Sequence, residues 1–261
     1  MTQYAALPSA EYILPIAYEA GACLLRFFGD TSYQVTQKSD GSDVTTADEQ
    51  AEALIVAQLQ ALTPNIPIIG EESFAKGHKP DIDKIFWLVD ALDGTKIFIS
   101  GQKEFTVNIA LVVDGEPVLG VVYAPALSRL FVGIKNQGAF VEENGQRRSI
   151  HCRKAPVEGL TVFASVFFDK RPELLDQYLQ QTGQSVAVRT PLGSSLKFCN
   201  IAAGKGDLYP RFGRTMEWDT AAGEAVLRAA GGRVVDLDGK PMRYGKKPGF
   251  ENPAFLALGL P

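Results

Sequence analysis

The sequence predicts a mixed α/β fold, and two patterns along its 261 residues carry that prediction. Between residues 105 and 151, short apolar runs follow one another closely. Asp114-Gly115 and Asn144-Gly145 supply the residues that tight hairpin turns require. After Pro156, strands alternate with helices, which is typical of an α/β layer. We therefore expect an antiparallel meander followed by an α/β layer.

The composition is that of a globular protein with a large core, since 46% of the residues are hydrophobic and 21% are charged. The net charge is −4 and the 26 basic residues are scattered, which argues against a nucleic-acid polymer or an anionic membrane surface as partner. No apolar run reaches membrane-spanning length, and residues 1–4 lack the pattern of a signal peptide. We expect a cytoplasmic protein; the sequence leaves peripheral membrane association and the oligomeric state open.

Cysteine and histidine are too few and too dispersed to carry the chemistry. Three cysteines stand far apart, which argues against a disulfide framework and against a thiolate metal site. The two histidines offer little material for a zinc site or a histidine base. Chemistry must rest on carboxylates, which favour Mg²⁺ or Mn²⁺.

The first elements are two helices, at residues 10–28 and 47–62. The first carries an apolar stripe, and its Pro15 is acceptable only in the first turn. Thr46 and Glu49 form the expected capping box of the second. Asp48 either complements the dipole of that helix or has a functional role.

Paired acids follow the next expected strand, at residues 66–69. Glu71 and Glu72 read either as solvated loop charge or as ligands. Because one further apolar strand separates them from Asp90, Glu71 could reach the same end of the sheet and bind a metal.

The segment around residues 85–98 organises the chain. Residues 85–89 predict a strand buried on both faces, and Asp90 follows at its expected end. Asp93 comes next, and Gly94-Thr95 permits a tight turn whose amides can bind an anion. Two carboxylates beside such amides suit metal-assisted phosphate chemistry. Alternatively, Asp93 only stabilises a turn or caps a helix.

The remaining expected elements position one further acid. The meander strands are expected at residues 105–113, 117–123, 129–134, 139–142 and 148–151, with one face buried. Later strands are expected at residues 160–166, 185–189 and 206–209, and helices at 172–181 and 195–203. A last helix runs from Asp219 to Ala230, so Asp219 is either its N-cap or a functional acid.

In combination, several motifs resemble the inositol monophosphatase superfamily. In chain order they are Lys38-Ser39-Asp40, Val44-Thr45-Thr46-Ala47-Asp48, Gly70-Glu71-Glu72, the segment from Asp90 to Thr95, and Trp218-Asp219-Thr220-Ala221-Ala222-Gly223. Residues 93–96, 104–111, 193–199 and 206–211 resemble the 3′(2′),5′-bisphosphate nucleotidase branch. The resemblance implies a layered αβαβα sandwich. It also implies a first half at residues 1–155 with most metal ligands, and a second half at residues 156–261 with Asp219 and substrate contacts.

The resemblance also implies a cluster of two or three Mg²⁺ ions, for which Mn²⁺ can substitute. Glu71, Asp90, the Leu92 carbonyl and Thr95 would surround one ion, and Asp90, Asp93 and Asp219 a second. A bridging Asp90 suits the roughly 4 Å spacing of two-metal sites. By the same resemblance, Glu71 orients a water nucleophile, Asp48 and Thr95 deprotonate it, and Li⁺ inhibits.

The branch resemblance implies the substrate contacts and the reaction. The Gly94 and Thr95 amides, with Asp93 and Asp219, would hold one phosphate, and Ser195, Lys197 and Arg211 match nucleotide-contacting positions. The implied reaction removes the 3′-phosphate of adenosine 3′,5′-bisphosphate and gives AMP. Two departures from the branch bear on the substrate: Ile97 stands for a glutamate, and Val166-Phe167-Phe168 for a Ser-rich, His-containing stretch. A third departure, from the superfamily pattern, is Ala91 in place of the usual proline, which the metal site should tolerate.

Three alternatives stay open at this stage. The enzyme could be an inositol monophosphatase or another small sugar-phosphate phosphatase of the same superfamily. A haloacid-dehalogenase-type phosphatase also carries an acidic Asp-Gly-Thr box, but its acids are spaced Asp-x-Asp, unlike Asp90-x-x-Asp93. A metal-binding module without turnover is the third.

Overall fold

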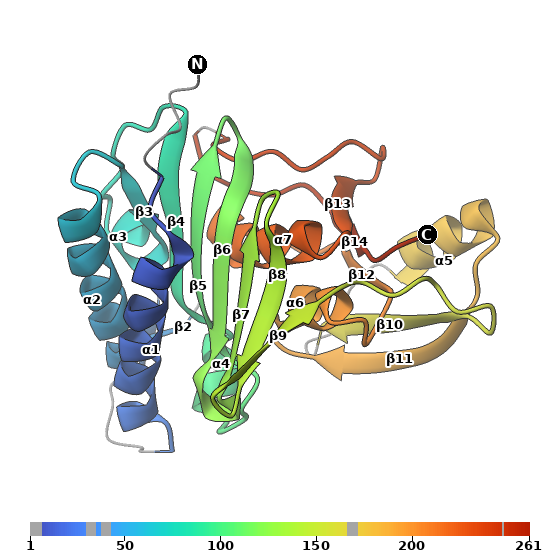
Figure 1. Cartoon of the computed structure of the whole chain (residues 1–261), viewed down its shortest axis with the longest axis horizontal. Helices are drawn as coiled ribbons and strands as arrows, with labels where there is room; N and C mark the ends of the chain where they lie inside the picture. Colours follow the sequence, from blue (N-terminus) through green and yellow to red (C-terminus); the bar gives the residue numbers. More distant parts are fainter. Residues whose placement is uncertain (1–6, 30–34, 38–42, 166–171, 247) are drawn as a thin grey trace.

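The computed structural model describes residues 7–29, 35–37, 43–165, 172–246 and 248–261, and Figure 1 shows their arrangement. A seven-stranded sheet has the order β3-β4-β5-β6-β7-β8-β9, and a five-stranded sheet has the order β11-β10-β12-β14-β13. A two-stranded sheet pairs β1 (Val35–Gln37) with β2 (Asp43–Thr45). Every neighbouring pair of the large sheet is antiparallel except β3 and β4.

The strands of the large sheet are β3 (Ile68–Gly70), β4 (Ile85–Asp93), β5 (Thr106–Val113), β6 (Glu116–Ala124), β7 (Arg129–Ile134), β8 (Gly138–Glu143) and β9 (Gln146–Ile150). Those of the second sheet are β10 (Leu160–Ser165), β11 (Val186–Leu192), β12 (Leu208–Arg211), β13 (Arg233–Asp236) and β14 (Phe255–Leu258). The helices are α1 (Ala10–Phe27), α2 (Thr46–Leu62), α3 (Glu71–Ala75), α4 (Thr95–Ile99), α5 (Pro172–Thr182), α6 (Leu196–Ala202) and α7 (Glu217–Ala229), with a 3₁₀ turn at Pro125–Leu127.

Helices α1 and α2 cover one face of the large sheet (Figure 1). Their apolar stripes, among them Ile13, Leu24, Ile55 and Leu59, are wholly buried against β4, β5 and β6. The expectation for Pro15 is wrong, because α1 begins at Ala10 and Pro15 lies inside the helix, beyond its first turn. The missing amide hydrogen costs one backbone hydrogen bond, which the burial of the stripe offsets.

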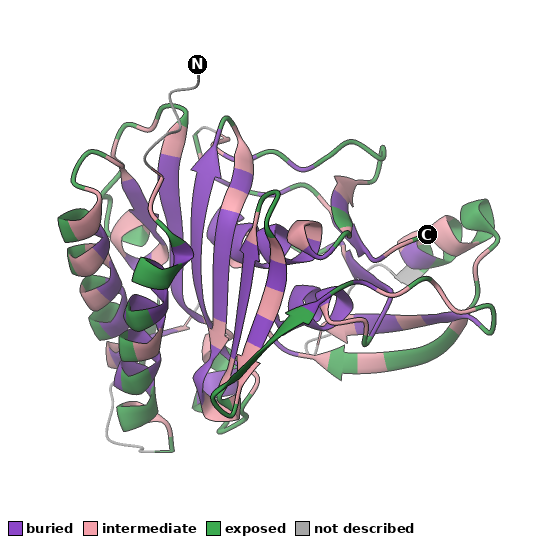
Figure 2. Ribbon diagram, viewed as in Figure 1, coloured by how far each residue is buried: buried purple, intermediate pink, exposed green. Residues whose placement is uncertain are grey.

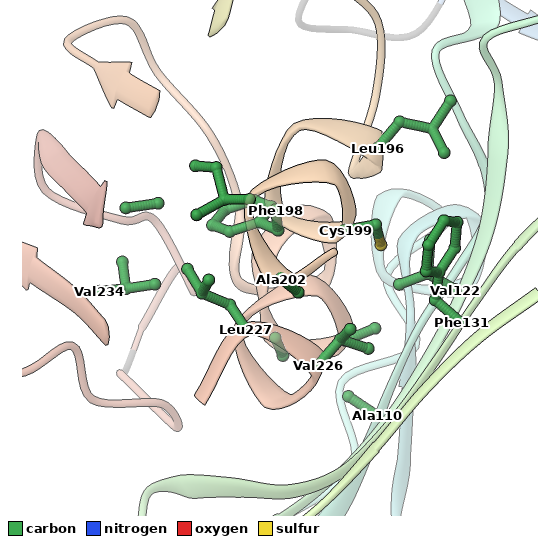
Figure 3. Packing of buried hydrophobic residues seen from close by; sticks show 14 of the residues in the cluster. Ala110, Val122, Phe131, Leu196, Phe198, Cys199, Ala202, Val226, Leu227 and Val234 are labelled. Atoms are coloured by element: carbon green, nitrogen blue, oxygen red, sulfur yellow. The ribbon is translucent and has the colours of Figure 1, made fainter. Parts of the chain in front are cut away.

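Helices α6 and α7 lie between the two sheets (Figure 3). Cys199 and Val226 face Val122 and Phe131 of the large sheet, whereas Phe198 and Leu227 lie on the other side, toward Val234 of the second sheet. α7 can approach β6 and β7 closely because Gly120 and Gly133 have no side chains; a Cβ there would lie 2.4 Å from α7 backbone atoms. The expectation of a meander with one buried face is therefore wrong for β5. Helices cover both faces, and all eight of its residues are buried (Figure 2).

Beyond the second sheet, α5 forms the last layer through Leu175, which packs with Leu160 and Leu208. The order helix, sheet, helix, sheet, helix confirms the αβαβα sandwich. The sheets divide between Ile150 and Leu160, but α7 of the second half packs on the first sheet. Separate domains at residues 1–155 and 156–261 stay a prediction.

Both hairpin predictions are confirmed, since Asp114-Gly115 and Asn144-Gly145 all have positive φ between β5 and β6 and between β8 and β9. The sequence did not predict four of the strands: β1, β2, β13 and β14. In the described part of the chain, no helix is long and apolar enough to cross a membrane.

Candidate active site

Three carboxylates from three separate elements meet at one edge of the large sheet. Oxygen atoms of Glu71, Asp90 and Asp219 all lie within 4.8 Å of one another. Glu71 opens α3 directly after β3, Asp90 lies in β4, and Asp219 lies in the first turn of α7. Parallel β3 and β4 bring the first two together, and the packing of α7 on the same sheet adds the third.

Asp90 does not end its strand, which corrects one expectation. β4 continues to Asp93 with an irregularity between the two acids, where Asp90 pairs with Asn108 and Asp93 with Thr106. Within this irregular segment the Leu92 amide donates to Asp90 Oδ1 at 3.0 Å. The bulge re-aims the strand, so both acids reach the same site.

Asp219 is not the N-cap of α7, which corrects a second expectation. Met216 holds the N-cap position, and its backbone amide donates to Asp219 Oδ2 at 2.8 Å. Burial raises the pKa of Asp219 well above its ordinary value, and the charges of Glu71 and Asp93 raise it further. A cation among these carboxylates would relieve that repulsion, and the donors are the hard oxygens that Mg²⁺ prefers. The residues therefore fit a divalent metal site.

Asp93 is held by groups from both halves of the chain. Its Oδ2 accepts from the Ser195 amide at 2.6 Å, from Asn108 Nδ2 at 3.3 Å and from Thr106 Oγ1 at 3.4 Å. Asn108 and Thr106 lie on β5 and are wholly buried. Since these bonds engage one oxygen, the other carboxylate oxygen of Asp93 can serve a ligand.

Asp48 links the start of α2 to the start of α4. Its Oδ1 accepts from Thr95 Oγ1 at 3.2 Å, and its Oδ2 accepts from the Thr45 amide at 2.8 Å and from Thr45 Oγ1 at 2.5 Å. The capping box therefore joins Thr45 to Asp48, one position before the expected pair of Thr46 and Glu49. Thr95 Oγ1 also lies 3.3 Å from the Leu92 carbonyl oxygen.

A cleft of about 250 Å³ opens beside the carboxylates. Predicted site residues that line it are Glu71, Asp93, Gly94, Thr95, Lys197, Arg211 and Asp219. Lys197 is buried, and its Nζ donates to the carbonyl oxygens of Leu192 at 3.2 Å and Ser194 at 2.6 Å. Burial lowers the pKa of Lys197 to about 8. Arg211 Nη2 donates to the Arg214 carbonyl at 3.0 Å, while its buried Nε has no hydrogen-bond partner among the described residues.

Ser195 is buried beside the acids, and its expected contact with the substrate stays a prediction. It is 1% exposed, its amide holds Asp93, and its hydroxyl donates to the Asp219 carbonyl at 2.9 Å and accepts from Asn108 Nδ2 at 3.0 Å. The lining of the cleft instead includes Ser194, which has a φ of 49°. Through these bonds Ser195 braces Asp93 and the backbone of Asp219.

Comparison with known proteins decides the family. The model of the inositol monophosphatase family matches residues 9–256. The chain belongs to the inositol monophosphatase family. Members of this family are metal-dependent, in agreement with the acidic cluster. The resemblance stated from the motifs is thereby confirmed.

Curated relatives narrow the comparison within the inositol monophosphatase family. A 3′(2′),5′-bisphosphate nucleotidase CysQ of Escherichia coli O6:H1 is 43% identical over 94% of this chain and 97% of the relative. The CysQ of Buchnera aphidicola is 36% identical over 96% and 93%. Among solved structures, CysQ of Bacteroides thetaiotaomicron has a TM-score of 0.79 at 32% identity, covering 96% of each chain. An IMPase of Thermotoga maritima also has a TM-score of 0.79, at 26% identity, covering 95% of this chain and 91% of that one.

Two of the three departures from the expected motifs can be located. Ala91 is buried within the irregular end of β4. Ile97 is buried in α4, and its Cδ1 lies where a side chain at Gly193 would go, 2.3 Å from an ideal Cβ. Ile97 thus packs α4 against the turn that precedes Ser195. Val166-Phe167-Phe168 falls outside the described residues.

The sequence interpretation missed Thr106 and Asn108, which hold Asp93. The sequence did indicate a role for them, because Thr106 and Asn108 are polar residues in the otherwise apolar strand β5, which pairs with the segment of β4 that carries Asp90 and Asp93. A buried polar side chain in such a position needs a hydrogen-bond partner. Pairing with β4 places the acids within reach.

Proposed function

We propose that this protein is a Mg²⁺-dependent phosphomonoesterase that removes the 3′-phosphate of adenosine 3′,5′-bisphosphate and gives AMP. The E. coli relative with the printed name 3′(2′),5′-bisphosphate nucleotidase CysQ covers almost the whole chain at 43% identity. The single structural observation that supports the substrate is the cleft itself. It places two cationic side chains, Lys197 and Arg211, beside the carboxylate cluster.

Two or three Mg²⁺ ions would be held by side chains already close together. Glu71, Asp90, the Leu92 carbonyl and Thr95 would hold one ion, and Asp90, Asp93 and Asp219 a second; the grouping of Glu71, Asp90 and Asp219 supports both sets. Bound Mg²⁺ supplies neutralisation of phosphate charge and a lowered pKa for water. Mn²⁺ has the same preference for oxygen ligands and should substitute.

Asp48 and Thr95 would move the proton of the attacking water. Thr95 Oγ1 already donates to Asp48 Oδ1, so its lone pairs can accept a proton from water while its own proton passes to the carboxylate. Thr45 holds the other Asp48 oxygen. Attack by the resulting hydroxide at phosphorus breaks the bond to the 3′-oxygen, which leaves with a proton from solvent. Glu71 would orient the water.

Gly94 and Thr95 line the cleft, and their amides would hold oxygens of the phosphate being removed. The second phosphate requires cations in the same cleft, and Lys197 and Arg211 line it. Lys197 Nζ is held by carbonyl oxygens, and Arg211 Nε lacks a partner among the described residues, so an anion could satisfy both side chains. An inositol monophosphate has no second phosphate to offer them.

An inositol monophosphatase activity is the second candidate. Ile97 favours it, because this apolar residue lines the cleft where the nucleotidase branch usually has glutamate. Against it stand the two cations, which a monophosphate would leave unused.

A panel of phosphate-release assays tests the proposal. It compares adenosine 3′,5′-bisphosphate, its sulfated analogue 3′-phosphoadenosine 5′-phosphosulfate, inositol monophosphates and fructose 1,6-bisphosphate at equal Mg²⁺. We expect the highest kcat/KM for the adenosine bisphosphate, and preference for an inositol monophosphate would contradict the substrate. No phospho-aspartate should be trapped at Asp90, since water attacks directly; detecting one would indicate dehalogenase-type chemistry. The cytoplasmic location stays a prediction.

A further inference from the structure

Glu52 is a buried acid that the proposed mechanism does not use. It lies on α2, one turn after Asp48, and is only 2% exposed. An ionised side chain is rarely buried to this extent unless its oxygens are bonded. The position of Glu52 therefore needs an explanation beyond packing.

The described hydrogen bonds of Glu52 all run to the first turn of α3. Its Oε2 accepts from the Glu72 amide at 2.7 Å, and its Oε1 accepts from the Ser73 amide at 2.7 Å and from Ser73 Oγ at 2.5 Å. The residue before this turn, Gly70, provides no side-chain cap. Glu52 thus satisfies, from another helix, amides that a capping side chain would normally satisfy.

Gly70 shows how closely the carboxylate lies over the turn. A Cβ on Gly70 would stand 2.5 Å from Glu52 Cδ and 2.6 Å from Oε1. Glycine at this position leaves the space that the carboxylate occupies. The Glu52 carboxylate thus fits closely against the junction of β3 and α3.

Glu71 lies between two fixed points. Gly70 is held in β3 by its pairing with Val89 of β4, and residues 72 and 73 are held by Glu52. The Glu71 side chain, which reaches Asp90 and Asp219, therefore leaves a backbone that is anchored on both sides. One face of α2 supports two parts of the site, because Asp48 also holds Thr95.

We propose that Glu52 is a positioning residue: by binding the first turn of α3, it orients Glu71 for metal binding. The inference rests on the proposed function, since it assumes that Glu71 holds a divalent ion. Residues that orient metal ligands commonly change metal affinity by about 10-fold to 100-fold when they are replaced. Loss of the Glu52 carboxylate should therefore weaken binding of the ion.

The test measures Mn²⁺ binding directly, by the electron paramagnetic resonance signal of free Mn²⁺, in the wild type, Glu52→Gln and Ser73→Ala. Glu52→Gln keeps the shape but turns an amide group toward backbone donors. We expect its affinity to fall at least about tenfold, with an intermediate loss in Ser73→Ala. At saturating Mn²⁺, KM for the phosphate ester should stay near the wild-type value.

Ile55→Val is the matched control, because Ile55 is wholly buried on the same helix but contacts the core on the α1–α2 side. It should lower Tm without changing Mn²⁺ affinity. If Glu52→Gln lowers Tm but binds Mn²⁺ like the wild type, Glu52 is only structural and the inference is wrong. If Glu52→Gln does not fold, Ser73→Ala decides: wild-type affinity overturns the inference, and weaker binding supports it. Absence of Mn²⁺ binding by the wild type would instead overturn the proposed function.

Discussion

The backbone amide of Ser195 donates a 2.6 Å hydrogen bond to Oδ2 of Asp93, which joins the two halves of the chain inside the site. The Ser195 hydroxyl donates at the same time to the Asp219 carbonyl. One residue of the second half thus positions acids that come from β4 and α7. The relative placement of the carboxylates depends on this contact and on the residues that support it.

Asn108 is the residue that most directly supports this contact. Asn108→Ala removes donors to both Asp93 Oδ2 and Ser195 Oγ. Because 1 Å of misplacement can cost on the order of 100-fold in rate, we expect kcat to fall tenfold or more. Stability should fall by about 1–2 kcal/mol. Steady-state kinetics and denaturant unfolding measure the two effects. Thr106→Val, which removes only a 3.4 Å bond, is the milder comparison. Equal kcat in the wild type and Asn108→Ala would refute the bracing role.

Asp219→Asn separates the ligand role from a helix-capping role. Asp219 Oδ2 accepts from the Met216 amide, and an asparagine oxygen can accept the same bond. The fold should therefore persist. Turnover should fall by orders of magnitude, because an amide is a much weaker ligand for a hard cation. Asp93→Asn should behave likewise. Circular dichroism and phosphate release check the two statements, and a fully active Asp219→Asn would show that the ligand assignment is wrong.

Glu224 predicts a pH dependence of stability that is separate from catalysis. Burial raises its pKa from 4.5 to about 7, although Tyr244 Oη donates to its Oε2 at 2.6 Å. Between these two pH values the folded state binds more protons than the unfolded state, so the free energy of unfolding falls as pH rises. The contribution lost is at most roughly 3 kcal/mol, at 1.36 kcal/mol per pKa unit.

Glu224→Gln should remove this contribution to the pH dependence of the free energy of unfolding. Arg228 and Lys246 lower the pKa of Glu224 and Glu116 raises it, and all three remain in the variant. Denaturant unfolding at pH 5, 6, 7 and 8 should show the stability of the variant rising relative to that of the wild type across this range. Parallel curves for the two proteins would contradict the raised pKa.

Removal of divalent ions should abolish activity. The cluster of Glu71, Asp90 and Asp219 offers only carboxylate oxygens, so no other group there can replace the cation. After exhaustive chelation, Mg²⁺ or Mn²⁺ should restore phosphate release, and full activity without either would exclude the two-metal proposal. Li⁺ should inhibit, whereas Na⁺ at equal ionic strength should not. Equal inhibition by both would indicate simple screening.

The parts predicted correctly from the sequence were those with a local signal. The apolar composition of residues 85–89 predicts a buried strand, and the backbone preference of Asp114-Gly115 predicts a turn. The meander, α6 and the layered sandwich followed from such signals together with the motif resemblance. The acids that meet in the site were identified because their motifs occur in order along the chain.

The errors arose where a distant segment decides the local structure. The residues near Asp219 in the sequence do not indicate that Glu217 accepts hydrogen bonds from the Gly245 and Lys246 amides. They also do not indicate that Met216 is the N-cap of α7. The hydrogen bonds that hold Ser195 also come from a distant residue, because Asn108, which donates to its hydroxyl, lies 87 positions earlier. Strand pairings such as β12 with β14 likewise join residues that are distant in the sequence, and they leave no local pattern.

The substrate prediction depends on Lys197 and Arg211. Lys197→Ala and Arg211→Ala should raise KM for adenosine 3′,5′-bisphosphate, each by about tenfold or more, because a charge-assisted hydrogen bond contributes about 1.5–3 kcal/mol. KM for a nucleoside monophosphate should change much less, since that substrate lacks the second phosphate. Lys205→Ala is the control, because Lys205 is an exposed lysine that does not line the cleft. It should leave both KM values unchanged.

The pattern of weakened substrate binding in the two variants distinguishes the possible roles of Lys197 and Arg211. If Lys197→Ala weakened both substrates equally, its Nζ would serve mainly to hold the Leu192 and Ser194 carbonyls in place, and the turn would be what the variant disturbs. If Arg211→Ala alone were selective, the second phosphate would contact the guanidinium, whose buried Nε has no partner among the described residues. Selective loss in both variants requires a ligand with two anionic groups, which an inositol monophosphate cannot provide. Equal loss in both would leave a metal-dependent phosphatase of this family without its proposed nucleotide specificity.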